Sequence, residues 1–239
     1  MDRRGNAITD YKGIIHTFVT HFKEKYGLTE VDGICVNNMV DTVTTTDPPA
    51  YAATFEQPIT LDEIVTALKT GGRNKAPGSD GISLEFYTAH WDTIRTAMLE
   101  KLNQMFIHKT ISPQQKRGII VSLPKNNGDQ TPDGYRPITL LNTDYKLLVL
   151  SRIMALRLSP VMEDQIQSSQ YCCLPGNSIL DALSVVRNVI AHAEVTRTPL
   201  CVLSLDFQSA FDRLSHPYLF QVLRGYGINP WFIERIQSP

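Results

Sequence analysis

The chain has 239 residues, of which 42% are hydrophobic and 20% charged, and its net charge is −1; this is a globular composition with enough apolar mass for a sizeable core. No apolar run reaches the roughly 18 residues of a membrane span, and the first ten residues lack the apolar region of a signal peptide. The four cysteines form no C-x-x-C pair and the six histidines have no metal-ligand spacing, so we expect a reduced intracellular protein, nuclear or cytoplasmic, without a zinc site.

The first 59 residues are expected to hold one helix and a linker. Apolar residues recur at helical spacing over 10–26, where Asp10 can cap the helix and Gly27 can end it. Residues 27–58 are polar, rich in Thr, Asp and Pro, and show no strong period. We interpret them as a loop or linker.

A second helix is predicted to begin at Thr60, because Thr60 and Glu63 fit a capping box. A loop rich in glycine and proline follows at 71–82. The helical pattern of apolar residues then returns over 83–108.

Two short β-type runs, 118–124 and 137–141, flank a polar segment and predict a hairpin with a long mobile tip. The surrounding segment 109–157 carries eight Lys or Arg against three Asp, a balance of +5, whereas residues 1–67 balance to −5. A basic middle segment is consistent with a nucleic-acid-binding face, since contacts to phosphates release counterions. It is equally consistent with solvated helix faces.

Mostly helices are predicted for the carboxy-terminal half of the chain. The apolar pattern is helical over 143–159 and over 179–195, and Ser178 with Asp181 fits a capping box for the second. Two shorter helices are expected to begin at prolines, which suit a first helical turn: Pro217 and Pro230. The last helix is predicted to leave an apolar face uncovered, which we interpret as a sign of truncation.

The string LSLDFQSAFD at 203–212 gives the most specific indication of chemistry in the sequence. The apolar run 200–206 suits a buried central strand, with Asp206 at its carboxyl end. A carboxylate there can hold the Mg²⁺ ions that phosphoryl transfer needs, and Phe207 can lend its backbone carbonyl. Spacing alone favours a simpler role for Asp206, capping the turn after a strand. Asp212 is interpreted as structural, at the start of the next helix.

This string resembles the palm motif L-D-F-x-x-A-F-D of non-LTR (LINE-type) retrotransposon reverse transcriptases. Four other segments resemble that family's motifs in order and spacing. They are N-K-A-P-G-S-D-G-I with E-F-Y-x-x-x-W at 74–91, I-I-V-S-L-P-K at 119–125, G-Y-R-P-I-T-L-L-N at 134–142 and S-Q-Y-C-C-L-P-G-N-S-I at 169–179. The resemblance covers about 60–239 and implies DNA synthesis with Mg²⁺ on an RNA template, from a DNA primer and deoxynucleoside triphosphates.

The resemblance also implies a fold and a domain organisation. The fold is α+β and helix-rich, with reverse-transcriptase-like fingers and an incomplete palm. Residues 1–59 would be an amino-terminal extension, 60–160 a fingers-like region, and 161–239 a partial palm that ends before the family's Y-x-D-D motif.

Individual residues acquire roles from the same resemblance. Asp206 would bind both catalytic metal ions, with Phe207 beside it, and Phe211 would exclude a 2′-hydroxyl from the incoming sugar. Lys125 and Arg136 would bind the incoming triphosphate, Lys as a point charge and Arg through two parallel hydrogen bonds.

The loop at 73–81 would contact the template backbone. It is not a Walker A sequence, because its glycine spacing is wrong. Arg73 and Lys75 would supply charge, and Gly78 and Gly81 would let the backbone approach the template. Without the resemblance, a plain loop between helices is the simpler interpretation.

The sequence departs from the family in two respects. Cys173 replaces a Phe and Asn177 replaces a basic residue, and no Y-x-D-D occurs in the 239 residues. We therefore expect that the chain alone does not polymerise. Two alternatives stay open: a module that binds RNA or RNA–DNA hybrid without chemistry, and an inert remnant whose exposed palm edge associates with another chain.

Overall fold

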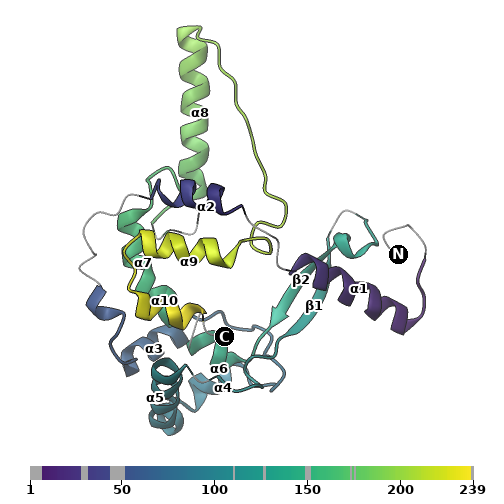
Figure 1. Ribbon diagram of the computed structural model, residues 1–239, viewed down its shortest axis with the longest axis vertical. Helices are drawn as coiled ribbons and strands as arrows, with labels where there is room; N and C mark the ends of the chain where they lie inside the picture. Colours follow the sequence, from purple (N-terminus) through teal and green to yellow (C-terminus); the bar gives the residue numbers. More distant parts are fainter. Residues whose placement is uncertain are drawn as a thin grey trace.

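The computed structural model describes residues 7–27, 32–43, 52–109, 111–125, 128–148, 152–172, 174 and 176–237. Figure 1 shows a helical body from which two parts project, a β-hairpin with a helix beside it and a single long helix with an extended segment alongside. The fold is helix-rich α+β, as predicted. Among the described residues, no helix combines the length and the apolar character needed to cross a membrane.

Helices, two strands and two 3-10 turns follow one another along the described part of the chain. They are α1 (Tyr11–Lys25), α2 (Gly33–Val40), the 3-10 turn η1 (Ala52–Thr54), α3 (Leu61–Thr70), α4 (Leu84–Ala89), α5 (Trp91–His108), β1 (Ile119–Pro124), the 3-10 turn η2 (Pro132–Gly134), β2 (Tyr135–Leu140), α6 (Thr143–Leu148), α7 (Ile153–Gln165), α8 (Ile179–Thr196), α9 (His216–Gly225) and α10 (Pro230–Gln237).

Local sequence signals set the starts of several helices, as predicted. The Asp10 carboxylate accepts a hydrogen bond from the Gly13 N–H at 2.7 Å and caps α1. Capping boxes open α3, through Thr60 and Glu63, and α8, through Ser178 and Asp181. Each box satisfies N–H groups that the first helical turn leaves without a partner.

Three predicted element boundaries are wrong. The expected linker 27–58 contains α2, which Asp32 caps through the Ile34 N–H at 2.9 Å, and η1. The helical region 83–108 is two helices, because the backbone leaves helical geometry at His90. The expected helix 143–159 is also two, α6 and α7, and α7 continues to Gln165.

The core is one cluster of buried side chains that joins Phe55 and Ile59, which lie between η1 and α3, to α3, α4, α5, α7, α9 and α10. Members with at most 1% of their surface exposed are Phe55, Ile64, Ala67, Leu102, Ile153, Met154, Val161, Phe232 and Ile233. The boundary proposed at residue 160 falls inside α7, and the three-part division itself stays a prediction.

The expectation that the last helix leaves an apolar face uncovered is wrong. In α10, Phe232 and Ile233 are fully buried, and the Phe232 ring lies 4.5 Å from that of Phe55. Arg235 donates from Nε to the Phe106 carbonyl at 3.2 Å, so α10 is also tied to the end of α5. The carboxy-terminal helix thus completes the core of the body.

The predicted hairpin is confirmed. β1 and β2 are antiparallel, with Ile119 opposite Leu140 and Pro124 opposite Tyr135. The polar connection includes residues 126 and 127, which lie outside the described residues. α1 lies against this hairpin, and the Phe18 and Tyr135 rings meet edge to face at 5.2 Å.

The predicted buried strand at 200–206 is wrong. These residues have no regular secondary structure, and the side chains of Leu203 and Leu205 are 77% and 76% exposed. A central strand needs a neighbour on each side, and within the described residues β1 and β2 pair only with each other. No described segment pairs with this run as a strand.

Candidate functional site

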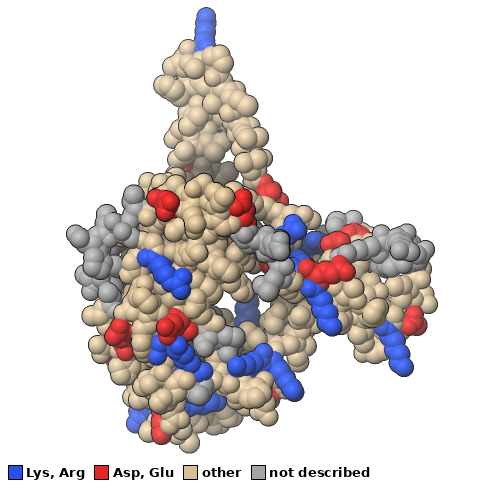
Figure 2. All heavy atoms as spheres, in the orientation of Figure 1, with Lys and Arg blue, Asp and Glu red and all other residues tan. Residues whose placement is uncertain are grey.

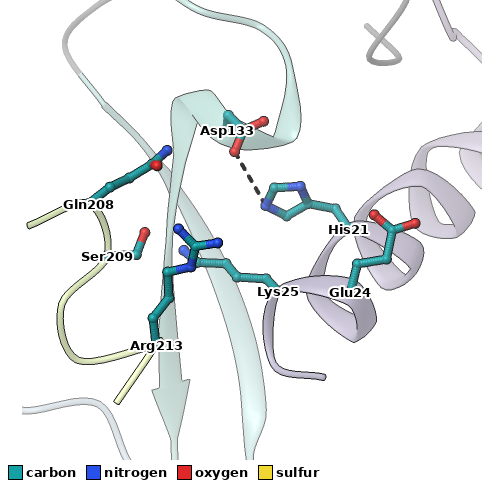
Figure 3. A pocket seen from close by; sticks show the side chains of 7 residues that line it. All are labelled: His21, Glu24, Lys25, Asp133, Gln208, Ser209 and Arg213. Carbon is teal, nitrogen blue, oxygen red and sulfur yellow. Dashed lines mark ion pairs between the residues drawn. The ribbon is translucent and has the colours of Figure 1, made fainter. Parts of the chain in front are cut away.

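Three segments that are far apart in the sequence meet around one polar cavity. They are the carboxy-terminal half of α1, the turn η2 that precedes β2, and residues 208–213, here named the palm-motif turn. The cavity has a volume of about 230 Å³ and is lined by His21, Glu24, Lys25, Asp133, Gln208, Ser209 and Arg213 (Figure 3). The hairpin and the string 203–212, which sequence motifs singled out separately, therefore share a site.

Two ionic contacts from α1 hold these segments together. Lys25 Nζ lies 2.7 Å from Asp212 Oδ2, which ties α1 to the palm-motif turn. His21 Nε2 lies 3.8 Å from Asp133 Oδ1, and Figure 3 shows the imidazole directed at that carboxylate. His21 and Lys25 are one helical turn apart, so they lie on the same face of α1.

The palm-motif turn is tightly folded. Ser209 adopts a left-handed backbone with φ of 56°, and its carbonyl accepts hydrogen bonds from the N–H groups of Asp212 and Arg213 at 3.0 and 3.1 Å. For a residue other than glycine this conformation costs about 1–2 kcal/mol. Such local strain is concentrated at functional sites in proteins.

The structure places the residues predicted to bind triphosphate on the hairpin beside this cavity. Lys125 Nζ donates to the Asp133 carbonyl at 2.7 Å, which holds its ammonium group next to the cavity lining. Arg136 lies opposite Leu123 on the adjacent strand and is exposed. Lys125 is thus bonded to Asp133, a residue that lines the same cavity as the palm-motif turn.

The residues predicted to act on metal and sugar are open to solvent: Asp206 and Phe207 directly precede the palm-motif turn, and Phe211 lies within it. Asp206 is exposed, Phe207 is 80% exposed and Phe211 is 94% exposed. The cavity lining does not include them. Their predicted roles are therefore neither supported nor contradicted by contacts in the chain.

Sequence reasoning missed His21, Lys25 and Arg213 as lining residues. No motif surrounds the first two, and their only signal is a spacing of four on the polar side of a helix. Arg213 directly follows the string 203–212 and could have been found by extending it by one residue. Asp212, interpreted as the start of a helix, instead precedes α9 by four residues and pairs with Lys25.

Comparison with known proteins identifies the family. The sequence profile of the reverse transcriptase (RNA-dependent DNA polymerase) family matches residues 123–238, from β1 through α10. The 149 kDa protein of transposon TX1 from Xenopus laevis is 35% identical over 184 residues, which are 77% of this chain and 14% of that protein. The chain is similar to the reverse transcriptases of non-LTR retrotransposons.

Other relatives of this chain agree with that similarity. The Pol polyprotein of a type-1 R2 retrotransposable element from Popillia japonica is 29% identical, across 72% of this chain and 23% of the polyprotein. A probable RNA-directed DNA polymerase from transposon BS of Drosophila melanogaster is 24% identical, across 90% of this chain and 24% of that protein. The chain thus spans between 14% and 24% of the length of these three relatives. The resemblance inferred from the motifs is confirmed.

Five of the eight Lys and Arg side chains of residues 109–157 make structural contacts. Hydrogen bonds to acidic side chains or to backbone carbonyls engage Lys109, Lys125, Lys146, Arg152 and Arg157. The side chains of Lys116, Arg117 and Arg136 make no hydrogen bond or ion pair with any described residue. On this segment, therefore, only Lys116, Arg117 and Arg136 have side chains that are not engaged by other described residues and could contact nucleic acid.

The loop predicted to contact the template is packed against the residues that follow β2. A Cβ on Gly78 would lie 2.3 Å from Asn142 Oδ1 and 2.4 Å from the Asn142 nitrogen, so only glycine fits. Ser79 Oγ also donates to Asn142 Oδ1 at 3.2 Å. Gly81 has φ of +72° and open space around it, so its backbone conformation is what requires glycine.

Charged residues at the start of this loop are exposed. The Lys75 side chain lies against Gly72, and Arg73 lies near Glu85. The Asn74 N–H donates to Glu85 at 2.8 Å, and this bond, together with the neighbouring Arg73 charge, lowers the pKa of that carboxyl. Arg73 and Lys75 are thus available to phosphates, and their role in template binding stays a prediction.

The Gly78→Ala substitution is expected to destabilise the chain by about 1–3 kcal/mol, because the new methyl group overlaps rigid backbone. Gly81→Ala should cost about 1–2 kcal/mol through its left-handed backbone alone. Urea unfolding measures both. Gly33→Ala in the first turn of α2 is the control, since a Cβ there meets no atom within 4 Å. Equal stability of the Gly78→Ala and Gly33→Ala variants would contradict the packing described.

Two residues depart from the family motif, Cys173 and Asn177, and the structure describes only the second. Cys173 lies outside the described residues. Asn177 donates from its side-chain amide to the Gln170 carbonyl at 2.8 Å and closes the turn before α8. In place of a charge available to nucleic acid, this position therefore carries a local structural contact.

The described residues do not fit a two-metal arrangement. They contain no group of three or more His, Cys, Asp and Glu side chains that could hold a metal ion. Asp206 is a single exposed carboxylate, which suits at most one Mg²⁺ ion that keeps most of its water ligands. The metal-dependent chemistry of the family therefore requires groups in addition to these.

Proposed function

We propose that this chain forms the fingers and the first palm segment of an RNA-directed DNA polymerase that acts inside the cell on an RNA template, a DNA primer and deoxynucleoside triphosphates. The observation that carries this proposal is the cavity that η2 of the hairpin connection and the palm-motif turn both line, with Lys125 bonded to the lining residue Asp133. Residues 1–59 are the amino-terminal extension, 60–160 the fingers and 161–239 the palm segment.

The exposed positions of the site residues suit these roles. The side chain of Arg136 makes no hydrogen bond or ion pair with the described residues, so it can offer its planar guanidinium to phosphate oxygens. Lys125 is held by one neutral carbonyl, which a triphosphate would replace with a stronger, charge-assisted bond. Phe211 is open to a sugar, and Asp206 with the Phe207 carbonyl offers hard oxygen ligands to Mg²⁺. Arg73, Lys75, Gly78 and Gly81 would lie along the template.

We further propose that the 239-residue chain by itself binds primer-template without extending it. Its sequence holds no Y-x-D-D motif, and the described residues supply no second carboxylate cluster. The alternative function, binding of RNA or RNA–DNA hybrid with no part in chemistry, is favoured by the free cations Lys116, Arg117 and Arg136 on and beside the hairpin.

Binding of an RNA–DNA primer-template should weaken with added salt, and a Lys125→Ala/Arg136→Ala double variant should bind about tenfold more weakly and with a smaller salt slope. Each lost phosphate contact reduces that slope by about 0.9. Fluorescence anisotropy across a salt titration measures both quantities, with primer extension assayed in the same samples.

The matched control is Lys12→Ala/Arg95→Ala, which removes the same charge from exposed positions on α1 and α5. It should bind as the unaltered chain does. If the two double variants bind equally, the hairpin cations have no specific role and the proposed function loses its support. If the unaltered chain extends the primer, the second part of the proposal is wrong.

A further inference from the structure

Three consecutive polar side chains are buried where β2 leads into α6: Asn142, Thr143 and Asp144. Buried polar groups in folded proteins are almost always hydrogen-bonded, so their partners show what they hold in place. Asp144 accepts hydrogen bonds from Lys101 Nζ at 2.9 Å and from Gln115 Nε2 at 2.7 Å. These bonds anchor the segment to α5 and to the residues before β1. Figure 1 shows α6 at the base of the hairpin, and Figure 2 shows the same face with its charges.

Other side chains of this segment hold the loop 71–82, which joins α3 to α4. Thr143 Oγ1 donates a hydrogen bond to the Ile82 carbonyl at 2.7 Å. One turn later, Lys146 Nζ donates to the Ala76 carbonyl at 3.2 Å. Both acceptors belong to the loop backbone, so the two bonds fix its path at two separate points.

Asn142 fixes the loop between those two points. The backbone of Gly78 lies so close to Asn142 that a Cβ there would overlap both its nitrogen and its Oδ1. Ser79 Oγ donates to the same Oδ1 at 3.2 Å. We name residues 142–146 the α6 clamp, because they grip the loop backbone along its length.

The α6 clamp leaves the cations of the loop exposed. Arg73 and Lys75 point to solvent, while the Asn74 N–H between them is held by Glu85 at 2.8 Å. An irregular segment that is mobile before binding loses conformational entropy when a ligand orders it. A segment that is already fixed avoids this cost and binds more tightly through the same contacts.

We propose that the α6 clamp is a positioning element for template binding, which fixes the loop backbone so that Arg73 and Lys75 meet template phosphates without first being ordered. Asn142, Thr143 and Lys146 act through the loop and need not touch nucleic acid themselves. This inference rests on the template-binding role proposed above for the loop. Because β2 leads directly into the clamp, the loop is also fixed relative to the hairpin.

Trypsin tests the first step, since it cleaves after Arg73 and Lys75 in proportion to the population in which the loop is open. The clamp variant Ser79→Ala/Thr143→Val removes two hydroxyl donors without a change of charge. Its loop should be cleaved about tenfold faster than that of the unaltered chain, as expected for the loss of two hydrogen bonds. Cleavage after Arg95 in α5 reports opening of the whole body and should not change.

Two further variants are matched controls for the clamp variant. Ser184→Ala/Thr196→Val makes the same changes on α8, where both hydroxyls bond within their own helix. Its loop should be cleaved at the rate of the unaltered chain. Thr143→Ser keeps the hydroxyl and should protect the loop as the native threonine does.

Fluorescence anisotropy with an RNA–DNA primer-template tests the second step. The clamp variant should bind about fivefold more weakly with an unchanged salt slope, because the same phosphate contacts form once the loop is ordered. Arg73→Ala/Lys75→Ala should instead reduce the slope by about 1.8, the value for two phosphate contacts. Adding the clamp substitutions to that variant should weaken binding no further, since they act through the missing cations.

The outcomes separate this inference from the proposed function. Equal loop cleavage of the unaltered chain and the clamp variant would overturn the inference. So would normal affinity in a clamp variant whose loop is open, or a further loss of binding when the clamp substitutions are added to Arg73→Ala/Lys75→Ala. If Arg73→Ala/Lys75→Ala itself binds as the unaltered chain does, the loop has no template role, and that part of the proposed function fails together with the inference.

Discussion

Replacing Arg157 with alanine is expected to destabilise the chain by about 3–5 kcal/mol, the loss typical when one partner of a buried ion pair is removed. Its side chain is only 7% exposed, and it meets Glu63 through two hydrogen bonds, from Nε at 2.6 Å and from Nη2 at 3.0 Å. Nη1 also donates to the Gln57 carbonyl at 2.8 Å, and the guanidinium lies 5.2 Å from the Phe106 ring. The substitution would remove the cation and two hydrogen bonds from the Glu63 carboxylate, and it would remove the Arg157 donor from the Gln57 carbonyl.

The destabilisation should depend on pH. Burial alone would raise the pKa of Glu63, but hydrogen bonds from Arg157 and Thr60 outweigh it and lower this pKa. A carboxyl whose pKa is lower in the folded state contributes stability above its unfolded pKa and loses that contribution as the pH falls through the folded value. The difference between the unaltered chain and Arg157→Ala should therefore be largest near neutral pH and shrink below about pH 4.

Urea unfolding at several pH values measures this difference, with two further variants as controls. Arg157→Lys keeps the charge but cannot form two parallel bonds, so it should lose part of the stability. Lys116→Ala removes an exposed cation of the same segment that has no described partner and should change stability by less than about 0.5 kcal/mol. An Arg157→Ala variant as stable as Lys116→Ala would show that the network around Glu63 contributes nothing.

Arg157 also shows what sequence patterns could and could not predict. It was one of eight basic residues counted toward a possible nucleic-acid face, yet it is buried against a helix 94 residues earlier in the chain. The count of charges along a segment carries no information about their tertiary partners. The Thr60–Glu63 capping box was predictable because it needs only residues three apart.

The same contrast applies to larger elements. The hairpin β1–β2 was predictable because its strands are near neighbours, whereas residues 200–206 needed strands that the described chain does not supply. In the candidate site, Lys125 and the palm-motif turn were located by family motifs. His21 and Lys25 were not, because α1 reaches the cavity through tertiary packing that no local pattern encodes.

The second large effect is expected at the junction between the carboxy-terminal helix and the rest of the core. Phe232→Ala should destabilise the chain by about 3–5 kcal/mol, because the ring is fully buried and its removal leaves a cavity. The ring packs 4.5 Å from that of Phe55, which precedes α3, so the cavity would separate α10 from this part of the core. Thermal and urea unfolding measure the loss.

Phe211→Ala is the matched control, since it removes the same side chain from a position that is 94% exposed. Its stability should equal that of the unaltered chain within about 0.5 kcal/mol. Because Phe211 contributes little to folding, any change that its removal causes in nucleotide binding can be assigned to the site. If Phe232→Ala is as mild as Phe211→Ala, the rest of the core folds independently of α10.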